Sequence, residues 1–156
     1  MKKIILFLTT VISLMSCGGT NETVLSTGIN LSDYKHCVVG TSSIDGSADL
    51  ADLVLKVENF LPEVLTVTSK TEAFDLIFEG QKVLTPAINV SSEKRDGLYY
   101  TYIAVSFHEL KTGKLLAVCK SSGVGSTVKE GRRYSYDHIK KELINLFSRR
   151  NDSKKR

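Results

Sequence analysis

The sequence has no tryptophan, only two prolines and three cysteines in its 156 residues, and it contains no internal repeat. Its longest apolar stretch, Ile4–Leu14, is interrupted by Thr9, Thr10 and Ser13 and is too short to span a bilayer. CxxC and HxxxH spacings are absent, as is a GxSxG nucleophile elbow. The sequence therefore carries no local signature of a membrane-spanning helix, a repeat array, a zinc site or a serine hydrolase.

The first seventeen residues resemble the leader of a bacterial lipoprotein. Met1-Lys2-Lys3 is basic, Ile4–Leu14 has the length of a signal-peptide apolar region, and Leu14-Met15-Ser16-Cys17 is similar to a lipobox. A small residue before the cysteine lets the peptidase approach the backbone, and the thiol is the nucleophile that accepts the lipid. We predict a cleaved leader over residues 1–16 and fatty acyl chains on Cys17, which anchor the chain to the membrane. An ordinary secretory leader with a chance cysteine, or a short buried helix, is the alternative.

The residues that follow Cys17 predict a flexible tether. Gly18, Gly19, Thr20 and Asn21 are small or polar, and we expect an irregular segment over residues 17–33. Gly18 stands where an aspartate would favour retention in the inner membrane. The predicted location is therefore the outer membrane, facing the periplasm.

The charge is concentrated at the C-terminus. The chain has a net charge of +4, and residues 149–156 hold five basic side chains and one acidic one. The remainder of the mature chain is close to neutral, which is not the footprint of a nucleic-acid-binding domain. We predict a disordered basic tail over residues 149–156, with contact to anionic lipid or cell-wall polymer as the alternative, and no nucleic-acid partner.

Two cysteines remain once Cys17 carries lipid. Cys37 and Cys119 both fall in predicted strands. In an oxidising periplasm they could form a disulfide that closes a loop of about 80 residues, or remain two buried free thiols.

Apolar periodicity predicts one α/β (α+β) domain over residues 34–148 in the order β-α-β-β-β-α. The expected architecture is a mixed sheet with a long β-hairpin and with helices packed on one side. The expected strands, one more than this order counts, are 34–41, 64–68, 74–80 continuing toward Val90, 98–110 and 115–121. Pro86 marks an edge, bulge or bend, Lys111–Lys114 is a tight turn, and residues 123–133 are a glycine-rich loop. The expected helices run from about residue 48 to 61, and from a cap at Ser135 through Phe147.

Candidate chemical groups are scattered along the chain. A metal site formed by His36, Cys37, His108 and Cys119 is conceivable if their strands are neighbours, but solvated histidines are the simpler interpretation. Asp75 and Glu79 share one face of the segment Phe74–Gly80, where they fit either acid–base chemistry or surface solubility. The segment Gly123-Val124-Gly125-Ser126-Thr127 only faintly resembles a phosphate-binding loop, because no lysine follows it. His138 is expected to face solvent. We predict no enzyme, no metal and no cofactor.

Three tyrosines lie together in the clearest predicted strand. Tyr99, Tyr100 and Tyr102 form a possible aromatic binding surface, and packing partly beneath a helix is the alternative.

Two segments resemble recurring motifs of a family of exported α/β lipoproteins. They are Phe74–Gly80 (FDLIFEG) and Glu109–Leu116 (ELKTGKLL), within a match over residues 34–148. The family includes the curli-secretion lipoprotein, the penicillin-binding-protein activator lipoproteins and the amino-terminal domain of the Tol-system propeller protein. The resemblance implies a non-catalytic role in docking an envelope protein partner. From it we expect a membrane-anchored binding or assembly module, with a small-ligand or cell-wall-polymer binder that uses the aromatic sheet face as the alternative.

Overall fold

The computed structural model describes residues 19–40 and 48–148. The predicted leader, Cys17 and the basic tail lie outside the described residues. The elements, in chain order, are β1 (Asn21–Leu25), η2 (Leu31–Asp33), β2 (Tyr34–Cys37), α1 (Ala48–Phe60), η3 (Leu61–Glu63), β3 (Thr66–Val67), α2 (Lys70–Phe78), β4 (Lys82–Arg95), β5 (Leu98–Glu109), β6 (Leu115–Gly125) and α3 (Val128–Ser148).

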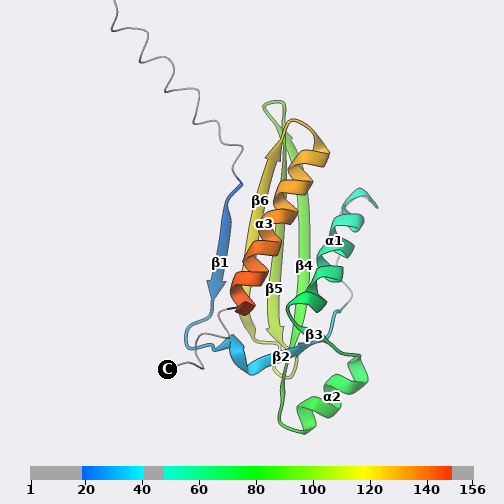
Figure 1. Ribbon diagram of the computed structural model, residues 1–156, viewed down its shortest axis with the longest axis vertical. Coiled ribbons are helices and arrows are strands. Elements are labelled where there is room, and N and C mark those ends of the chain that lie inside the picture. Colours follow the sequence, from blue (N-terminus) through cyan, green and yellow to red (C-terminus); the bar gives the residue numbers. More distant parts are fainter. Residues whose placement is uncertain (1–18, 41–47, 149–156) are drawn as a thin grey trace, which may run out of the picture.

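The strands form one six-stranded mixed sheet in the order β1-β6-β5-β4-β2-β3 (Figure 1). The β1–β6, β6–β5 and β5–β4 pairs are antiparallel, whereas β2 is parallel to both β4 and β3. This confirms the predicted class, a single α+β domain built on a mixed sheet. The long hairpin predicted around Lys111–Lys114 is the β5–β6 pair, and Gly113 takes the positive φ of 70° that its turn requires.

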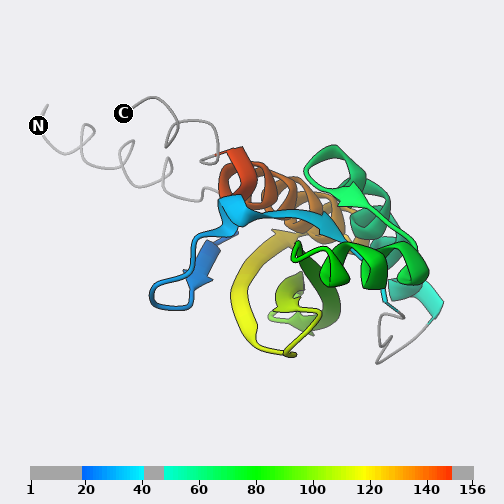
Figure 2. The same cartoon turned by 90° about the horizontal axis from the view of Figure 1, so that it is seen from below.

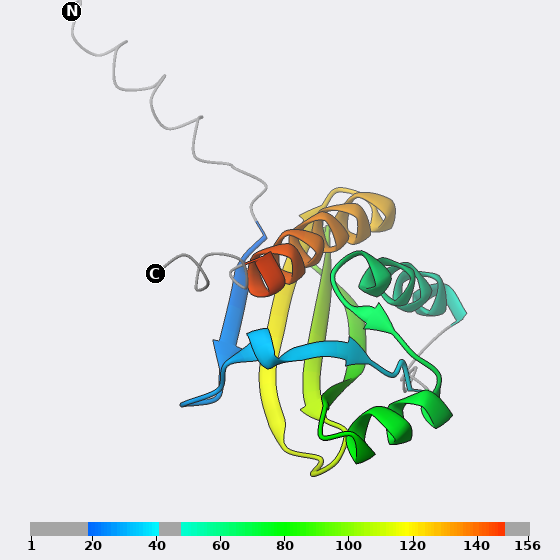
Figure 3. The ribbon, with the colours of Figure 1, turned by 60° about the horizontal axis from the view of Figure 1, so that its bottom comes forward.

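One face of the sheet is covered by α3 and α1, which lie side by side over the curled strands (Figures 2 and 3). On β5, the alternating residues Ile103, Val105 and Phe107 are buried beneath them, as the sequence pattern predicts. Phe107 meets Phe147 of α3 edge to face, with ring centroids 5.2 Å apart. The core of the domain therefore lies between these two helices and the central strands.

The segment expected to be a tether instead contains β1 and η2, so this prediction is wrong from Asn21 onward. β1 pairs antiparallel with β6, from Asn21 opposite Ser121 to Leu25 opposite Ala117. An edge strand gains its main-chain hydrogen bonds from a single neighbour, so a mostly polar segment can join a sheet without a strong apolar pattern. The chain is thus held against the sheet almost from the first described residue.

The strand predicted over residues 74–80 is also wrong, because Lys70–Phe78 forms the helix α2. Ser69 and Glu72 form a capping box, in which each side chain accepts a hydrogen bond from the backbone N–H of the other residue. Ala73, Leu76 and Ile77 then face the domain at helical spacing. A short apolar run fits both the 3.6-residue period of a helix and the two-residue period of a strand. Here the capping box favours the helix.

β4 begins only after this helix, at Lys82. Its parallel neighbour β2 pairs with it only as far as Leu84, so Pro86 has a strand on one side alone. The predicted edge character of Pro86 is confirmed, since a residue without an N–H is tolerated where one ladder is missing.

The glycine-rich loop predicted over residues 123–133 does not exist. β6 continues to Gly125, α3 begins at Val128, and Ser135 is a buried interior residue of this helix rather than its cap. A Cβ atom on Gly123 would stand 2.2 Å from the carbonyl oxygen of Gly131, and one on Gly131 would stand 2.7 Å from the carbonyl oxygen of Tyr99. These glycines allow the backbones of α3, β5 and β6 to pack closely, so the resemblance to a phosphate-binding loop has a packing origin.

We expect Gly123→Ala to lower the free energy of unfolding by about 1–3 kcal/mol, because the added methyl must displace backbone atoms rather than a mobile side chain. Thermal unfolding followed by circular dichroism measures the change. Gly40→Ala is the matched control, since the nearest atom to its Cβ is 3.8 Å away. Equal melting temperatures for the two variants would show that α3 does not approach β6 this closely.

Candidate interaction surfaces

The two cysteines of the domain do not form a disulfide. Cys37 lies on β2 and Cys119 on β6, both are buried and free, and β4 and β5 lie between their strands. Three strand spacings amount to about 14 Å along the sheet, about twice the Cα separation that a disulfide tolerates. The possible pairing is therefore wrong. Burial raises the pKa of each thiol to about 11, which keeps both protonated at neutral pH.

The histidines do not converge either. His108 Nδ1 lies 3.2 Å from the carbonyl oxygen of Gly113 in the β5–β6 turn. His138, expected to face solvent, is half-buried, with Nδ1 3.0 Å from the carbonyl oxygen of Ser122. Within residues 19–40 and 48–148, no group of three or more His, Cys, Asp or Glu side chains has the geometry to hold a metal ion.

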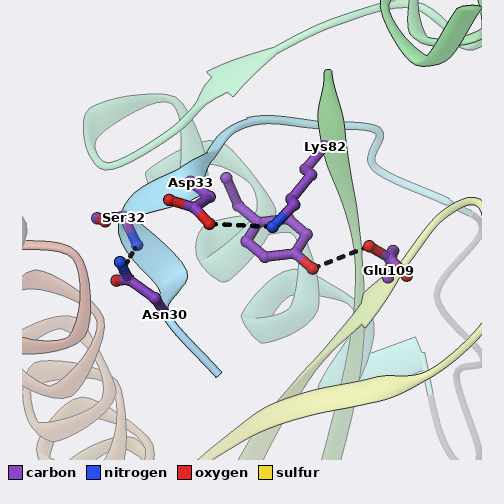
Figure 4. Close-up of polar contacts among 6 residues, drawn as sticks. Asn30, Ser32, Asp33, Lys82 and Glu109 are labelled. Atoms are coloured by element: carbon purple, nitrogen blue, oxygen red, sulfur yellow. Dashed lines mark hydrogen bonds and ion pairs between the residues drawn. The ribbon is translucent and has the colours of Figure 1, made fainter. Parts of the chain in front are cut away.

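A polar network connects the start of β2 to β4 and β5 (Figure 4). The Tyr34 hydroxyl donates to Glu109 Oε1 at 2.9 Å, and Thr112 donates to the other carboxylate oxygen at 2.6 Å. Lys82 lies over the Tyr34 ring and forms an ion pair with Asp33 at 2.9 Å. Hydrogen bonds from Thr112 and Tyr34 lower the pKa of Glu109. Burial, together with the bond to Glu109, raises the pKa of Tyr34 to about 12. The network fixes the junction of β2, β4 and the β5–β6 turn.

Tyr34→Phe should lower the free energy of unfolding near neutral pH by about 1 kcal/mol, the usual net value of one hydrogen bond. A folded-state pKa of about 12 against an ordinary value of 10.0 means that Tyr34 stabilises the fold fully below pH 10 and loses this contribution as the pH rises toward 12. Chemical denaturation measured across this range should therefore show a shallower loss of stability in the variant. Tyr134→Phe is the control, and identical pH slopes in Tyr34→Phe and the wild type would contradict the assignment.

The three tyrosines predicted to form one surface are divided between the two sheet faces. The strand alternation places Tyr99 on the side of the buried residues Thr101 and Ile103, where α3 approaches. Tyr100 and Tyr102 lie on the opposite side, and the Tyr102 hydroxyl donates to Glu93 at 3.0 Å. Only two of the three can therefore contribute to an aromatic surface on one face.

The face that carries Tyr100 and Tyr102 has none of the described helices across its centre (Figure 3). Its other side chains on the three central strands are mostly small, polar or aliphatic, and they are half-buried or exposed. They include Ala87, Asn89 and Ser91 of β4, Ala104 and Ser106 of β5, and Val118, Ser122 and Val124 of β6. Near its centre Lys120 of β6, level with Ala104, forms an ion pair with Glu22 of β1 at 3.9 Å, and the surface offers a broad contact area.

The helix α2 presents a second surface at the end of the domain where β4 begins (Figure 1). Ala73, Leu76 and Ile77 face the domain, whereas Phe74 and Phe78, one helical turn apart, are 58% and 95% exposed. The sequence pattern missed this aromatic pair because it predicted a strand, although the Ser69-x-x-Glu72 capping signal could have indicated the helix.

Asp75 and Glu79 do share one face, but it is a face of α2 rather than of a strand. With Glu72 and His36 they line a shallow hollow of about 430 Å³ beside β3. The His36 Nδ1 atom is buried without a hydrogen-bond partner in the described part of the chain. The acidic side of α2 thus adjoins its aromatic pair.

A further cavity of about 370 Å³ lies between β1, the segment that leads into η2, and the end of α3. Leu25, Leu31 and Phe147 supply apolar walls, and Glu142 accepts a hydrogen bond from Thr23 at 2.5 Å. This hydrogen bond joins the edge strand β1 to α3 at the wall of the cavity.

No family model and no curated protein matches this sequence. Among solved structures, the domain is similar to the PelC dodecamer from Paraburkholderia phytofirmans. The match has 14% identity and a TM-score of 0.52, and it covers 83% of this chain and 98% of that one. A single-substitution variant of the same dodecamer gives the same identity and TM-score, with 99% of that chain covered.

A PDZ domain protein from Parabacteroides distasonis is also similar, with 10% identity and a TM-score of 0.51 over 88% of this chain. The match spans only 39% of that protein. At these identities the likeness shows a shared fold. None of the described helices is both long and apolar enough to cross a bilayer.

Proposed function

We propose that this chain is a lipoprotein of the bacterial envelope, anchored through Cys17, whose domain is a non-catalytic binding or assembly module. The anchor rests on the order of basic residues, apolar stretch and Leu14-Met15-Ser16-Cys17. The proposed location is the outer membrane, with the domain in the periplasm. The proposed partner is an envelope protein.

The observation that carries the binding role is the aromatic pair on α2. A phenylalanine that is 95% exposed beside another that is 58% exposed gains almost nothing from the fold of its own chain. Adjacent exposed aromatic side chains mark contact surfaces in monomers more often than scattered apolar residues do. Phe74 and Phe78 on a short, capped helix therefore suit a contact with another protein, and aromatic anchors dominate such interfaces.

Further copies of the same chain are the first partner to consider. The PelC structure that shares this fold is described as a dodecamer, which shows that a domain of this architecture can assemble with itself. In the present chain the acidic residues Glu72, Asp75 and Glu79 flank the aromatic pair and would restrict it to a partner surface with complementary charge.

The alternative is a binder of a small ligand or cell-wall polymer on the open sheet face. Tyr102, 38% exposed, favours it, because aromatic rings on an uncovered sheet can stack against flat or ring-shaped ligands. This alternative and the assembly role depend on different residues, Tyr102 and Phe78, and one experiment can separate them.

The anchor predicts that mass spectrometry of the native protein will find an N-terminal peptide beginning at Cys17 and carrying acyl chains. Cys17→Ser should lose both the lipid and the membrane fractionation, because the serine hydroxyl does not replace the thiolate nucleophile. Cys119→Ala keeps the lipobox and should remain in the membrane. An unmodified cysteine at position 17 in the native protein would contradict the proposed lipid anchor.

The binding role predicts photo-crosslinks from α2 in intact cells. Benzoylphenylalanine in place of Phe78 should give defined protein adducts, whereas the same group in place of Leu55, 54% exposed on α1, should give few. Adducts at multiples of the chain mass would identify self-assembly, and other masses would identify a different partner. The same group is also placed at Tyr102. If position 78 gives no protein adducts and position 102 gives polymer adducts, the alternative is favoured.

A further inference from the structure

The described chain begins fixed to the sheet. The backbone N–H of Thr20 donates to Ser122 Oγ at 2.9 Å, and the N–H of Ser122 donates to the carbonyl oxygen of Thr20 at 2.9 Å. A side chain at Gly19 would collide with the carbonyl oxygen of Ser122. The start of the domain is therefore held at one position on β6 and offers little slack.

This position limits how far the domain can stand from the membrane, given the proposed anchor at Cys17. Only Gly18 separates Cys17 from Gly19. Two trans peptide units span at most about 7 Å between Cα atoms. The acyl chains of the proposed anchor enter the bilayer, so Cys17 lies at the membrane interface. Gly19 therefore lies no more than about 7 Å from that interface.

The β4–β5 hairpin extends beyond this point. β1 is antiparallel to β6, so the chain before Thr20 leads toward the end of β6, where the tip of the β4–β5 hairpin lies (Figure 1). Ser122 is level with Tyr102, and the four residues from Tyr102 to Leu98 carry the hairpin about 13 Å further. With the strands upright on the membrane, the tip outreaches the anchor and enters the headgroup layer.

The tip has the side chains of an interfacial segment. Leu98 is 39% exposed, and the cations of Lys94 and Arg95 lie over the rings of Tyr99 and Tyr100 at 5.1 and 4.7 Å. Tyrosine rings and long basic side chains are the residues that settle at the boundary between water and lipid, because each has an apolar body and a polar end.

Charge is distributed unevenly along the molecule, and the hairpin tip lies at its more basic end. The tip (residues 93–98) and the first turns of α3 (residues 128–134) together carry five basic and three acidic side chains. The opposite end, residues 63–82 around α2 together with the β5–β6 turn (residues 109–114), carries four basic and five acidic ones. The two ends are separated by the length of β4, about 45 Å of strand. An anionic surface would therefore attract the tip more strongly than the opposite end.

We infer that the tip of the β4–β5 hairpin, with the first turns of α3, docks onto anionic phospholipid headgroups beside the lipid anchor. Docking holds the long axis of the domain away from the bilayer and turns the aromatic pair of α2 toward the aqueous space. The inference rests on the proposed anchor, and it adds a membrane-contacting surface and a fixed orientation.

The natural absence of tryptophan allows a direct test with single-tryptophan variants of the full lipidated protein. Leu98→Trp places the probe at the tip, and Phe78→Trp places it on α2. Each protein is incorporated into vesicles of phosphatidylcholine and phosphatidylglycerol with brominated acyl chains, and flotation is recorded beside tryptophan emission. The emission of Leu98→Trp should be quenched and shifted to the blue, whereas that of Phe78→Trp should match the value in non-brominated vesicles.

The charge contribution is tested in the Leu98→Trp background. Arg95→Gln with Arg133→Gln should reduce quenching roughly twofold or more in phosphatidylglycerol vesicles, because each basic residue near an anionic surface adds to attraction. The matched control is Lys111→Gln with Lys114→Gln in the β5–β6 turn, which should leave quenching unchanged. Vesicle flotation with no quenching of Leu98→Trp, or with equal quenching of both probes, overturns the docking while the anchor stands. A protein that does not float overturns the anchor and the docking together.

Discussion

The close approach of α3 to β5 and β6 is the constraint on which the rest of the structure depends. Gly123, Gly125 and Gly131 allow backbone to meet backbone, and Ser121 Oγ donates to the carbonyl oxygen of the buried Ser135 at 2.9 Å. A buried hydroxyl must find such a partner, so the contact also fixes the rotation of the helix. With that rotation set, Ile139, Leu143 and Phe147 reach the core over Phe107.

The same helix also places the N-terminal edge of the sheet. Thr23 of β1 donates to Glu142, and His138 contacts the carbonyl oxygen of Ser122, next to the point where Thr20 is held. β1 is therefore supported by β6 within the sheet and by α3 above it. This support explains how a short polar edge strand is held so close to the proposed anchor, and why the proposed orientation of the domain depends on it.

Sequence patterns predicted those parts of the fold whose residues face one buried surface with a regular period. The alternation around Ile103, Val105 and Phe107, and the helical stripe that includes Leu53 and Val57, gave the correct element types because burial imposes the pattern. The errors fell where one specific contact, near or far along the chain, decides the structure. The capping box makes residues 70–78 a helix, and pairing with β6 makes residues 21–25 a strand. The close approach of α3 requires the glycines after Ser122.

The candidate surfaces were less predictable than the fold for the same reason. The exposure of Phe78 depends on α2 being a helix that touches the domain through only one of its faces. The separation of Tyr99 from Tyr100 follows directly from strand alternation, and the pattern could have shown it. The distance between Cys37 and Cys119 depends on strand order, which the spacing of residues along the chain does not reveal.

The burial of these two thiols has a consequence for biogenesis if the chain is exported to an oxidising compartment, as proposed. Before folding, each cysteine has an ordinary pKa near 8.5 and is open to thiol–disulfide exchange. Once β2 and β6 are in the sheet, burial protects both sulfur atoms and suppresses their thiolate forms. Under the proposed export, folding and oxidation therefore compete for the chain. A molecule that oxidises first would join two strands that the native sheet keeps apart, and it would need reduction before it could fold.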